Sequence, residues 1–141
     1  MTSRDLVLRW IEQISRVVAR LLGRREEAAL DLAREQLEEA TGQLLGPLLQ
    51  LVPRLDPESA AELLADPFRT YGYAQLVGLQ SAVARASGRM AEADDLARRA
   101  VALGGQACRR LEQPAPEWLE WVAAGERDLT ALSPETADPG S

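Results

Sequence analysis

Carboxylates, one thiol and arginines are the side chains of this chain that could carry chemistry. The acidic residues form two clusters, each within about one helical turn, namely Glu26, Glu27 and Asp31, and Glu35, Glu38 and Glu39. Carboxylates on facing helices can hold a pair of metal ions, but such sites usually also use a Glu-x-x-His motif. Because the chain has no histidine, we interpret both clusters as solvated helix faces and expect no metal and no other cofactor.

Cys108 is the single cysteine, and Arg109 and Arg110 follow it. Neighbouring guanidinium groups can lower a thiol pKa and make the thiolate a better nucleophile. A cysteine without a partner is more often a small apolar side chain within a core. Since no histidine is present to act as its base, we expect Cys108 to pack as an inert side chain.

Three residue types are absent: histidine, lysine and asparagine, and all sixteen basic residues are arginine. Without lysine the chain has no phosphate-loop lysine and no Schiff base. Without histidine it has no Ser-His or Cys-His nucleophile pair and no histidine zinc site. We therefore predict no catalytic residue and a protein that is not an enzyme.

Charge is unevenly distributed along the 141 residues, whose net charge is −6. Residues 1–25 carry +4, residues 26–66 carry −8 and residues 67–141 carry −2. A net negative protein repels polyanions, so we expect no nucleic-acid binding. Arg9, Glu12 and Arg16 interrupt the apolar residues near the N-terminus, which argues against a secretory signal and predicts a cytoplasmic protein.

Hydrophobic spacing predicts an all-α fold of antiparallel helical hairpins with about six helices and no strand. Thr2 is the predicted N-cap of the first helix and Gly23 its C-cap. Asp-Pro pairs at 56–57 and 66–67 each predict a helix start, and Gly46-Pro47 predicts a helix end.

The remaining expected boundaries are 24–45 for the second helix, 87–88 for the end of the fourth, 89–103 for the fifth and 117–132 for the last. Gly104-Gly105 is expected to interrupt the fifth helix, with a further turn or two up to residue 112. Residues 1–132 are predicted to form one domain, and residues 133–141 a flexible tail.

An internal echo links two turns of the chain. The segments 23–28 and 88–93 match at four of six positions, and each follows one amphipathic helix and begins another. In both segments a glycine is expected to turn the chain. The alanine five residues later, Ala28 or Ala93, is expected to let two helices approach closely.

The second of these segments resembles a tetratricopeptide-type hairpin. The stretch from Ala74 to Leu103 has a helix, a tight turn at Gly88, and alanines at 93 and 100 spaced as in the second helix of that repeat. In the first segment Glu35 stands where the second alanine would be, so the resemblance implies two hairpins rather than a regular array.

The whole chain also resembles a small, uncharacterised bacterial all-helical family, through Arg4-Asp5, Ile11-Glu12 and the stretch 88–100. That second resemblance implies a fold and no activity.

A helical-hairpin architecture without catalytic residues favours a protein-interaction module, such as a scaffold or adaptor. Tetratricopeptide grooves often hold the terminal carboxylate of a partner with lysine and asparagine, and this chain has neither. Arginines could substitute for them. The predicted groove residues are Arg69, Tyr73, Arg85 and Arg89.

Two apolar stripes run along the first helix. One has coiled-coil-like spacing, with residues 7, 11, 14, 18 and 21, and residues 6, 10, 17 and 21 form the other. One stripe is enough to dock the helix within its own chain, so the second could contact another copy in a homodimer. The predicted interface residues are Leu6, Val7, Trp10, Ile14, Val17 and Leu21. The alternative is a thick core that uses both stripes.

The sequence is also compatible with two further functions. The first helix is basic and amphipathic, which is also typical of a helix that lies on a membrane surface. An apolar pocket between helices would instead indicate a sensor that binds a small molecule. The protein partner of an interaction module is not identified by the sequence.

Overall fold

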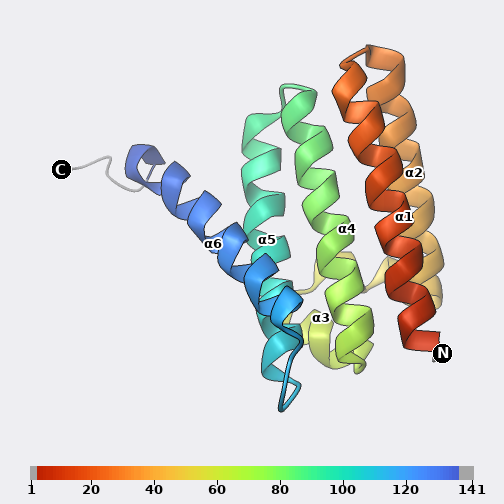
Figure 1. Cartoon of the computed structure of the whole chain (residues 1–141), viewed down its shortest axis with the longest axis vertical. Coiled ribbons are helices and arrows are strands. Elements are labelled where there is room, and N and C mark those ends of the chain that lie inside the picture. Colours follow the sequence, from red (N-terminus) through yellow and green to blue (C-terminus); the bar gives the residue numbers. More distant parts are fainter. Residues whose placement is uncertain (1–2, 137–141) are drawn as a thin grey trace.

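The computed structural model describes the backbone of residues 3–136 and the side chains of residues 6–132. This part of the chain is all-helical, as predicted, with six α-helices and two short 3₁₀ helices. In chain order the elements are α1 (Ser3–Arg24), α2 (Glu27–Leu45), η1 (Gly46–Gln50), η2 (Val52–Arg54), α3 (Pro57–Leu64), α4 (Pro67–Ala86), α5 (Met90–Arg109) and α6 (Pro116–Thr136) (Figure 1).

Aspartate caps set the starts of α3 and α4 where the sequence predicts them. The carboxylate of Asp56 accepts a hydrogen bond from the N–H of Ser59 at 3.1 Å, and that of Asp66 accepts one from the N–H of Phe68 at 2.9 Å. The hydrogen bonds from Ser59 also lower the pKa of Asp56. A proline follows each cap, at a position where a helix does not need the N–H group.

The first turn lies beyond the predicted position. We expected Gly23 to end the first helix, but α1 continues through it to Arg24, and Arg25 adopts the positive φ of 58°. A left-handed conformation is costly for a residue with a Cβ atom, so a glycine usually takes this role. Gly88 does so in the turn between α4 and α5, with φ 82°.

This shift breaks the echo between the two turns. Ala93 is completely buried, as expected, whereas Ala28 is exposed and Ala29 takes the buried position in α2. The echo therefore predicted the correct residue in the second hairpin and the wrong one in the first.

Gly104 and Gly105 do not interrupt the fifth helix, contrary to the prediction, because α5 runs unbroken to Arg109. Gly104 is buried, and a Cβ atom there would lie 2.8 Å from Trp121 and 2.9 Å from Val122 of α6. A glycine inside a helix costs ~1 kcal/mol relative to alanine. The close approach of α6 to α5 at this position requires the missing side chain.

The last helix is longer than predicted. α6 begins at Pro116 and its backbone remains helical to Thr136, so the expected tail from 133 starts within the helix. The rest of that predicted tail, and the predicted cap Thr2, lie outside the described residues.

Helix α4 lies at the centre of the bundle, with α1 and α2 on one side and α5 on the other (Figure 1). Ten of its residues are buried, so it has little surface left for solvent. The largest completely buried side chains come from several elements and meet around it: Ile11, Val18, Leu37, Leu45, Val52, Leu76, Val77 and Leu103. The core is therefore built on α4 rather than on the first helix.

Small side chains join α4 to α5. Ala93 and Ala100 are buried at this contact, and the hydroxyl of Ser81 donates a hydrogen bond to the carbonyl of Ala93 at 2.6 Å. Ala97, expected to pack here too, is only half-buried and faces the groove described below.

Candidate functional site

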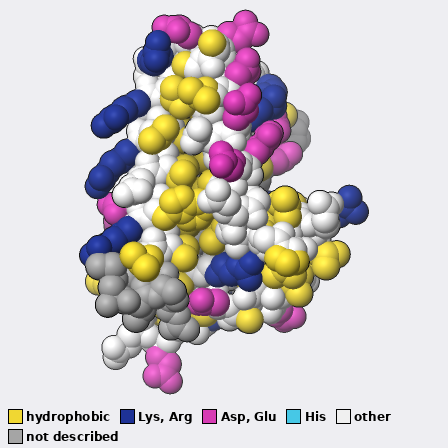
Figure 2. Space-filling model, turned by 90° about the vertical axis from the view of Figure 1, so that its right-hand side faces the viewer, with side chains coloured by type: hydrophobic (Ala, Val, Ile, Leu, Met, Phe, Trp, Pro, Cys, Tyr) yellow, Lys and Arg dark blue, Asp and Glu magenta, His cyan; other side chains and the backbone are white. Residues whose placement is uncertain are grey.

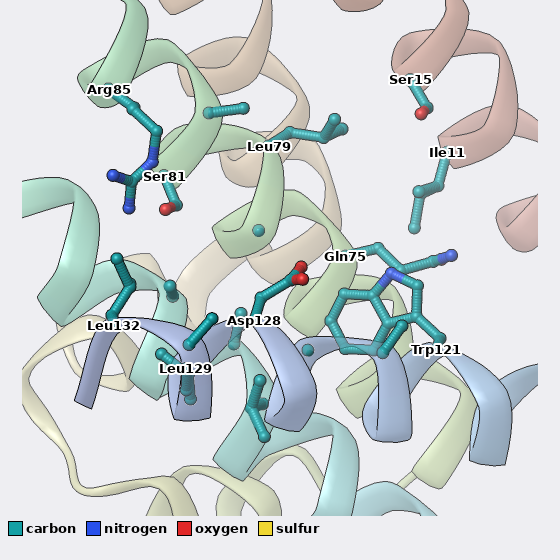
Figure 3. Close-up of a pocket in the computed structure, with 18 of the residues that line it drawn as sticks. Ile11, Ser15, Gln75, Leu79, Ser81, Arg85, Trp121, Asp128, Leu129 and Leu132 are labelled. Atoms are coloured by element: carbon teal, nitrogen blue, oxygen red, sulfur yellow. The ribbon is translucent and has the colours of Figure 1, made fainter. Parts of the chain in front are cut away.

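An open groove of about 660 Å³ is lined by α1, α4, α5 and α6 (Figure 3). Its lining is mostly apolar, and it comes from all four helices: Ile11, Glu12 and Ser15 of α1, Gln75, Gly78, Leu79, Ser81, Ala82 and Arg85 of α4, Ala97, Ala100 and Val101 of α5, and Trp121, Ala124, Gly125, Asp128, Leu129, Ala131 and Leu132 of α6. Because it is concave, mostly apolar and lined by four helices, the groove is the candidate site.

Aromatic packing fastens the beginning of α6 to the bundle. Trp118 stacks on Tyr71 at 4.2 Å between ring centroids, and it meets Phe68 edge-on at 5.0 Å. Trp121 meets Tyr71 edge-on at 5.7 Å. Such pairs contribute about 0.5–1.5 kcal/mol each beyond the area that they bury. This half of α6 is held firmly against α4 and α5.

The second half of α6 leaves the bundle. A Cβ atom on Gly125 would lie only 2.5 Å from Val101 of α5, so the two helices nearly touch at this crossing. Beyond it α6 diverges from α4 (Figure 1). Leu129 and Leu132 are half-buried and line the groove from the α6 side (Figure 3). The groove is the space that this divergence leaves.

Few polar groups reach the groove, and they differ in their partners. Arg85 forms an ion pair with Asp94 at 2.7 Å, at the end of α4. Glu12 forms an exposed pair with Arg16 at 3.7 Å. The carboxylate of Asp128 points from α6 into the space between α6 and α4 (Figure 3). Two acidic side chains and one basic side chain, Glu12, Asp128 and Arg85, thus line a groove that is otherwise mostly apolar.

The four predicted groove residues do not converge on one site. The guanidinium of Arg69 donates to the carbonyls of Leu44 at 3.0 Å and Leu45 at 2.8 Å, which satisfies the C-terminal end of α2. Tyr73 is buried in the core. Of the four, only Arg85 lines the groove.

Arg89 lies elsewhere, in a separate surface hollow with Arg34 and Glu38, and forms an ion pair with Glu92 at 2.9 Å. Arg69, Arg85 and Arg89 therefore do not meet at one place in the structure. Their actual partners are carbonyls and carboxylates of neighbouring elements.

Arg99 is a structural residue that the sequence did not indicate. Its guanidinium donates to the carbonyls of Leu55 at 2.6 Å and Val52 at 2.9 Å. It also reaches the hydroxyl of Tyr73 at 3.3 Å and lies 5.7 Å from the centre of that ring. It therefore ties the connector between α2 and α3 to the central hairpin.

The predicted interface residues of α1 are divided between the core and the surface. Leu21 is buried, and Val7, Trp10 and Ile14 are partly buried against the core. Leu6 and Val17 remain exposed, by 55% and 41%. Ile11, Val18 and Leu21 of the first stripe therefore pack inside the domain, whereas Leu6 and Val17 of the second stay accessible.

The residues considered for chemistry do not form a reactive site in the described part of the chain. Cys108 packs beside Tyr71 and Trp118, and burial raises its thiol pKa more strongly than Arg109 lowers it. The residues of both acidic clusters are exposed, and no three acidic or cysteine side chains among residues 6–132 converge to hold a metal ion.

Most of the groove was missed at the sequence level. Its lining on α6 is indicated only by the spacing of Trp121, Gly125, Leu129 and Leu132, which reads as an ordinary core stripe. Nothing in the local sequence shows that this stripe continues beyond the contact between α6 and α5.

The chain matches no protein-family model, and neither a curated protein nor a solved structure is significantly similar to it. Between residues 3 and 136, no helix has the length and apolar character that crossing a membrane requires. The tetratricopeptide resemblance remains a prediction from the sequence.

Proposed function

We propose that this protein is a non-catalytic helical interaction module that binds an amphipathic helix of another protein in the groove beside α6. The observation that carries the proposal is the groove itself: an apolar surface open to solvent and bounded by helices on both sides. Grooves of this kind take up the apolar face of a partner helix, read as anchors at i, i+3 or i+4, and i+7.

The dimensions of the groove favour a short helix. From Gln75 to Arg85 on α4 its lining extends over eleven residues, a rise of ~15 Å or nearly three helical turns. Ala82 and Ala97 offer small side chains that let a partner helix approach closely. Glu12 and Asp128 favour basic residues beside the apolar anchors, since Arg85 is already paired with Asp94.

The experiment screens a displayed library of helical peptides of about twelve residues, slightly longer than the stretch of helix that the groove can cover. We expect the enriched peptides to have apolar residues at helical spacing and basic residues beside them. Ala82→Phe, which fills the groove, should reduce their binding at least ~10-fold, the equivalent of about 1.4 kcal/mol. Ala86→Phe, one turn further along α4 at an exposed position outside the groove, is the matched control.

Two results would overturn the proposal. Enriched peptides without helical periodicity would remove the helix as the occupant. Peptides that bind wild type, Ala82→Phe and Ala86→Phe equally would place the binding surface elsewhere.

A small molecule is the second candidate occupant. The volume of about 660 Å³ falls within the ~300–1,000 Å³ of small-molecule sites. The indole of Trp121 lines the groove and reports on it by fluorescence. A change in that fluorescence on screening apolar compounds, lost in Ala82→Phe, together with no peptide enrichment, would favour the sensor over the interaction module.

In the membrane-surface alternative a docked α1 could offer lipid only its exposed residues, such as Leu6 and Val17. Ile11, Val18 and Leu21, which a lipid interface would take up, are buried between α1 and its neighbours. Flotation with anionic liposomes tests this alternative, and we expect the protein to stay at the bottom of the gradient. A cytoplasmic location remains a prediction from the sequence.

A further inference from the structure

The outer face of the α1–α2 hairpin carries an exposed apolar strip. Leu6 and Val17 of α1 are 55% and 41% exposed, and Leu32 of α2 is 44% exposed. Trp10 and Ile14 are partly exposed beside them. Figure 2 shows apolar side chains down the middle of this side of the molecule, away from the groove at α6. We refer to these five residues as the apolar strip.

Opposite charges flank the strip. Arg9, Arg16 and Arg20 are exposed along α1, and Asp31, Glu35 and Glu39 are exposed along α2. Each set repeats at helical spacing, so each forms a row on its own helix. In Figure 2 basic side chains follow one edge of this face, and acidic side chains gather on the other in its upper part.

The two rows do not neutralise each other within the chain. Among the described residues no ion pair joins the two rows, because Arg24 pairs with Glu26 at the turn and Arg16 pairs weakly with Glu12 on its own helix. Because the helices are antiparallel and join at residues 25–26, Arg20 lies level with Asp31 and Arg16 lies level with Glu35. The face therefore presents a basic edge, an apolar strip and an acidic edge, in register.

We propose that this face binds a second copy of the chain, about a twofold axis that runs parallel to α1 and α2. Such an axis lays one strip on the other and places α1 of each copy over α2 of its partner. This axis leaves the position of each residue along the helix axes unchanged. Arg20 of one copy therefore meets Asp31 of the other, and Arg16 meets Glu35, twice in the dimer. A twofold axis across the helices would instead bring arginines against arginines.

The size of the face sets the expected affinity. A pair of helices of this length spans roughly 33 Å by 20 Å, so two copies bury roughly 1,300 Å². That area is at the lower end for stable protein interfaces. Exposed ion pairs add little energy, and they act here mainly to select the orientation. We therefore expect a dissociation constant on the order of micromolar.

The first test measures mass by sedimentation equilibrium, from about 1 to 100 µM, around the expected dissociation constant. The chain should pass from its monomer mass of 15.4 kDa to twice that value. Val17→Glu should weaken the dimer at least ~10-fold, because a carboxylate loses its water at the strip. Ala19→Glu, at an exposed position of the same helix off the strip, is the matched control and should remain dimeric.

The second test exchanges the charges. Chains with Arg16→Glu and Arg20→Glu should be monomeric, and so should chains with Asp31→Arg and Glu35→Arg. A mixture of the two should dimerise, because each copy then meets opposite charges along both edges. The effect should shrink at high salt, where exposed pairs are screened.

Three results would overturn the proposal: a wild-type monomer at every concentration, a dimer that survives Val17→Glu, or charge variants that fail to recover on mixing while each is folded by circular dichroism. The proposal does not depend on the groove at α6. Ala82→Phe should leave the dimer intact even where it abolishes peptide binding, so the two ideas fail separately.

Discussion

The two helical hairpins of this protein use their polar side chains in opposite ways. In the α4–α5 hairpin Ser81 bonds to a carbonyl of the facing helix, Arg85 pairs with Asp94, and Arg99 binds two carbonyls of the connector. In the α1–α2 hairpin most charged side chains point into solvent, and in the described residues Arg24 pairs with Glu26 only at the turn between the helices.

Position in the bundle explains this difference. The α4–α5 hairpin has neighbours on both sides, so its polar groups must find partners within the protein. The α1–α2 hairpin contacts the rest of the bundle mainly through α4, which leaves its outer face to water or to a partner. The α4–α5 hairpin therefore forms the central scaffold of the bundle, whereas the α1–α2 hairpin exposes a surface.

The largest expected contrast is between two arginines. Arg99→Met should destabilise the protein by ~2–4 kcal/mol, because it leaves the carbonyls of Val52 and Leu55 without their donor. Arg20→Met on the peripheral hairpin should change the free energy of unfolding by less than ~0.5 kcal/mol. Urea denaturation of both variants measures the contrast, and equal effects would contradict the division between scaffold and surface.

A smaller contrast is expected between the two alanines of the sequence echo. Ala93→Leu should overpack the contact between α4 and α5 and cost ~1–3 kcal/mol, because the site is completely buried. Ala28→Leu, at the matching position of the first hairpin, is exposed and should be nearly neutral, since alanine and leucine both favour helix. Thermal melting of the pair tests this, and a neutral Ala93→Leu would refute the packing role of that alanine.

The smallest effect at neutral pH concerns Tyr71, which belongs to the aromatic cluster that holds α6. Burial raises the pKa of Tyr71 to about 12, with a further contribution from the negative charges that Cys108 and Glu117 can carry. The folded state thus holds the phenol proton more tightly than the unfolded chain, whose value is near 10. The resulting stability is present below pH 10 and is lost as pH rises towards 12.

Tyr71→Phe removes this titration but keeps the ring. The free energy of unfolding of wild type minus that of Tyr71→Phe should therefore be constant from about pH 7 to 9. Above pH 10 this difference should decrease, because wild type loses the stability that the protonated phenol contributes. Urea denaturation across this range measures it. A constant difference up to pH 11 would mean that the hydroxyl is not desolvated.

Much of the fold could be predicted from local signals. Asp56 and Asp66, each followed by proline, start α3 and α4 because a short side chain can satisfy the first free N–H groups of a helix within a few residues. The absence of histidine and lysine restricts the available chemistry wherever the residues lie. Helical spacing places Ile11 and Val18 on the apolar face of α1, and both are buried.

Other features were decided only by the tertiary structure, because they depend on residues far apart in the chain. The sequence showed two stripes on α1, but only the packing of α1 against α2 and α4 decided that Leu21 is buried and Val17 exposed. The groove exists because Gly104 and Gly125 allow α6 to cross α5 at close range and then diverge from α4. Spacing along one helix determines which residues share a face, whereas the angle at which two helices cross is set by the shapes of both.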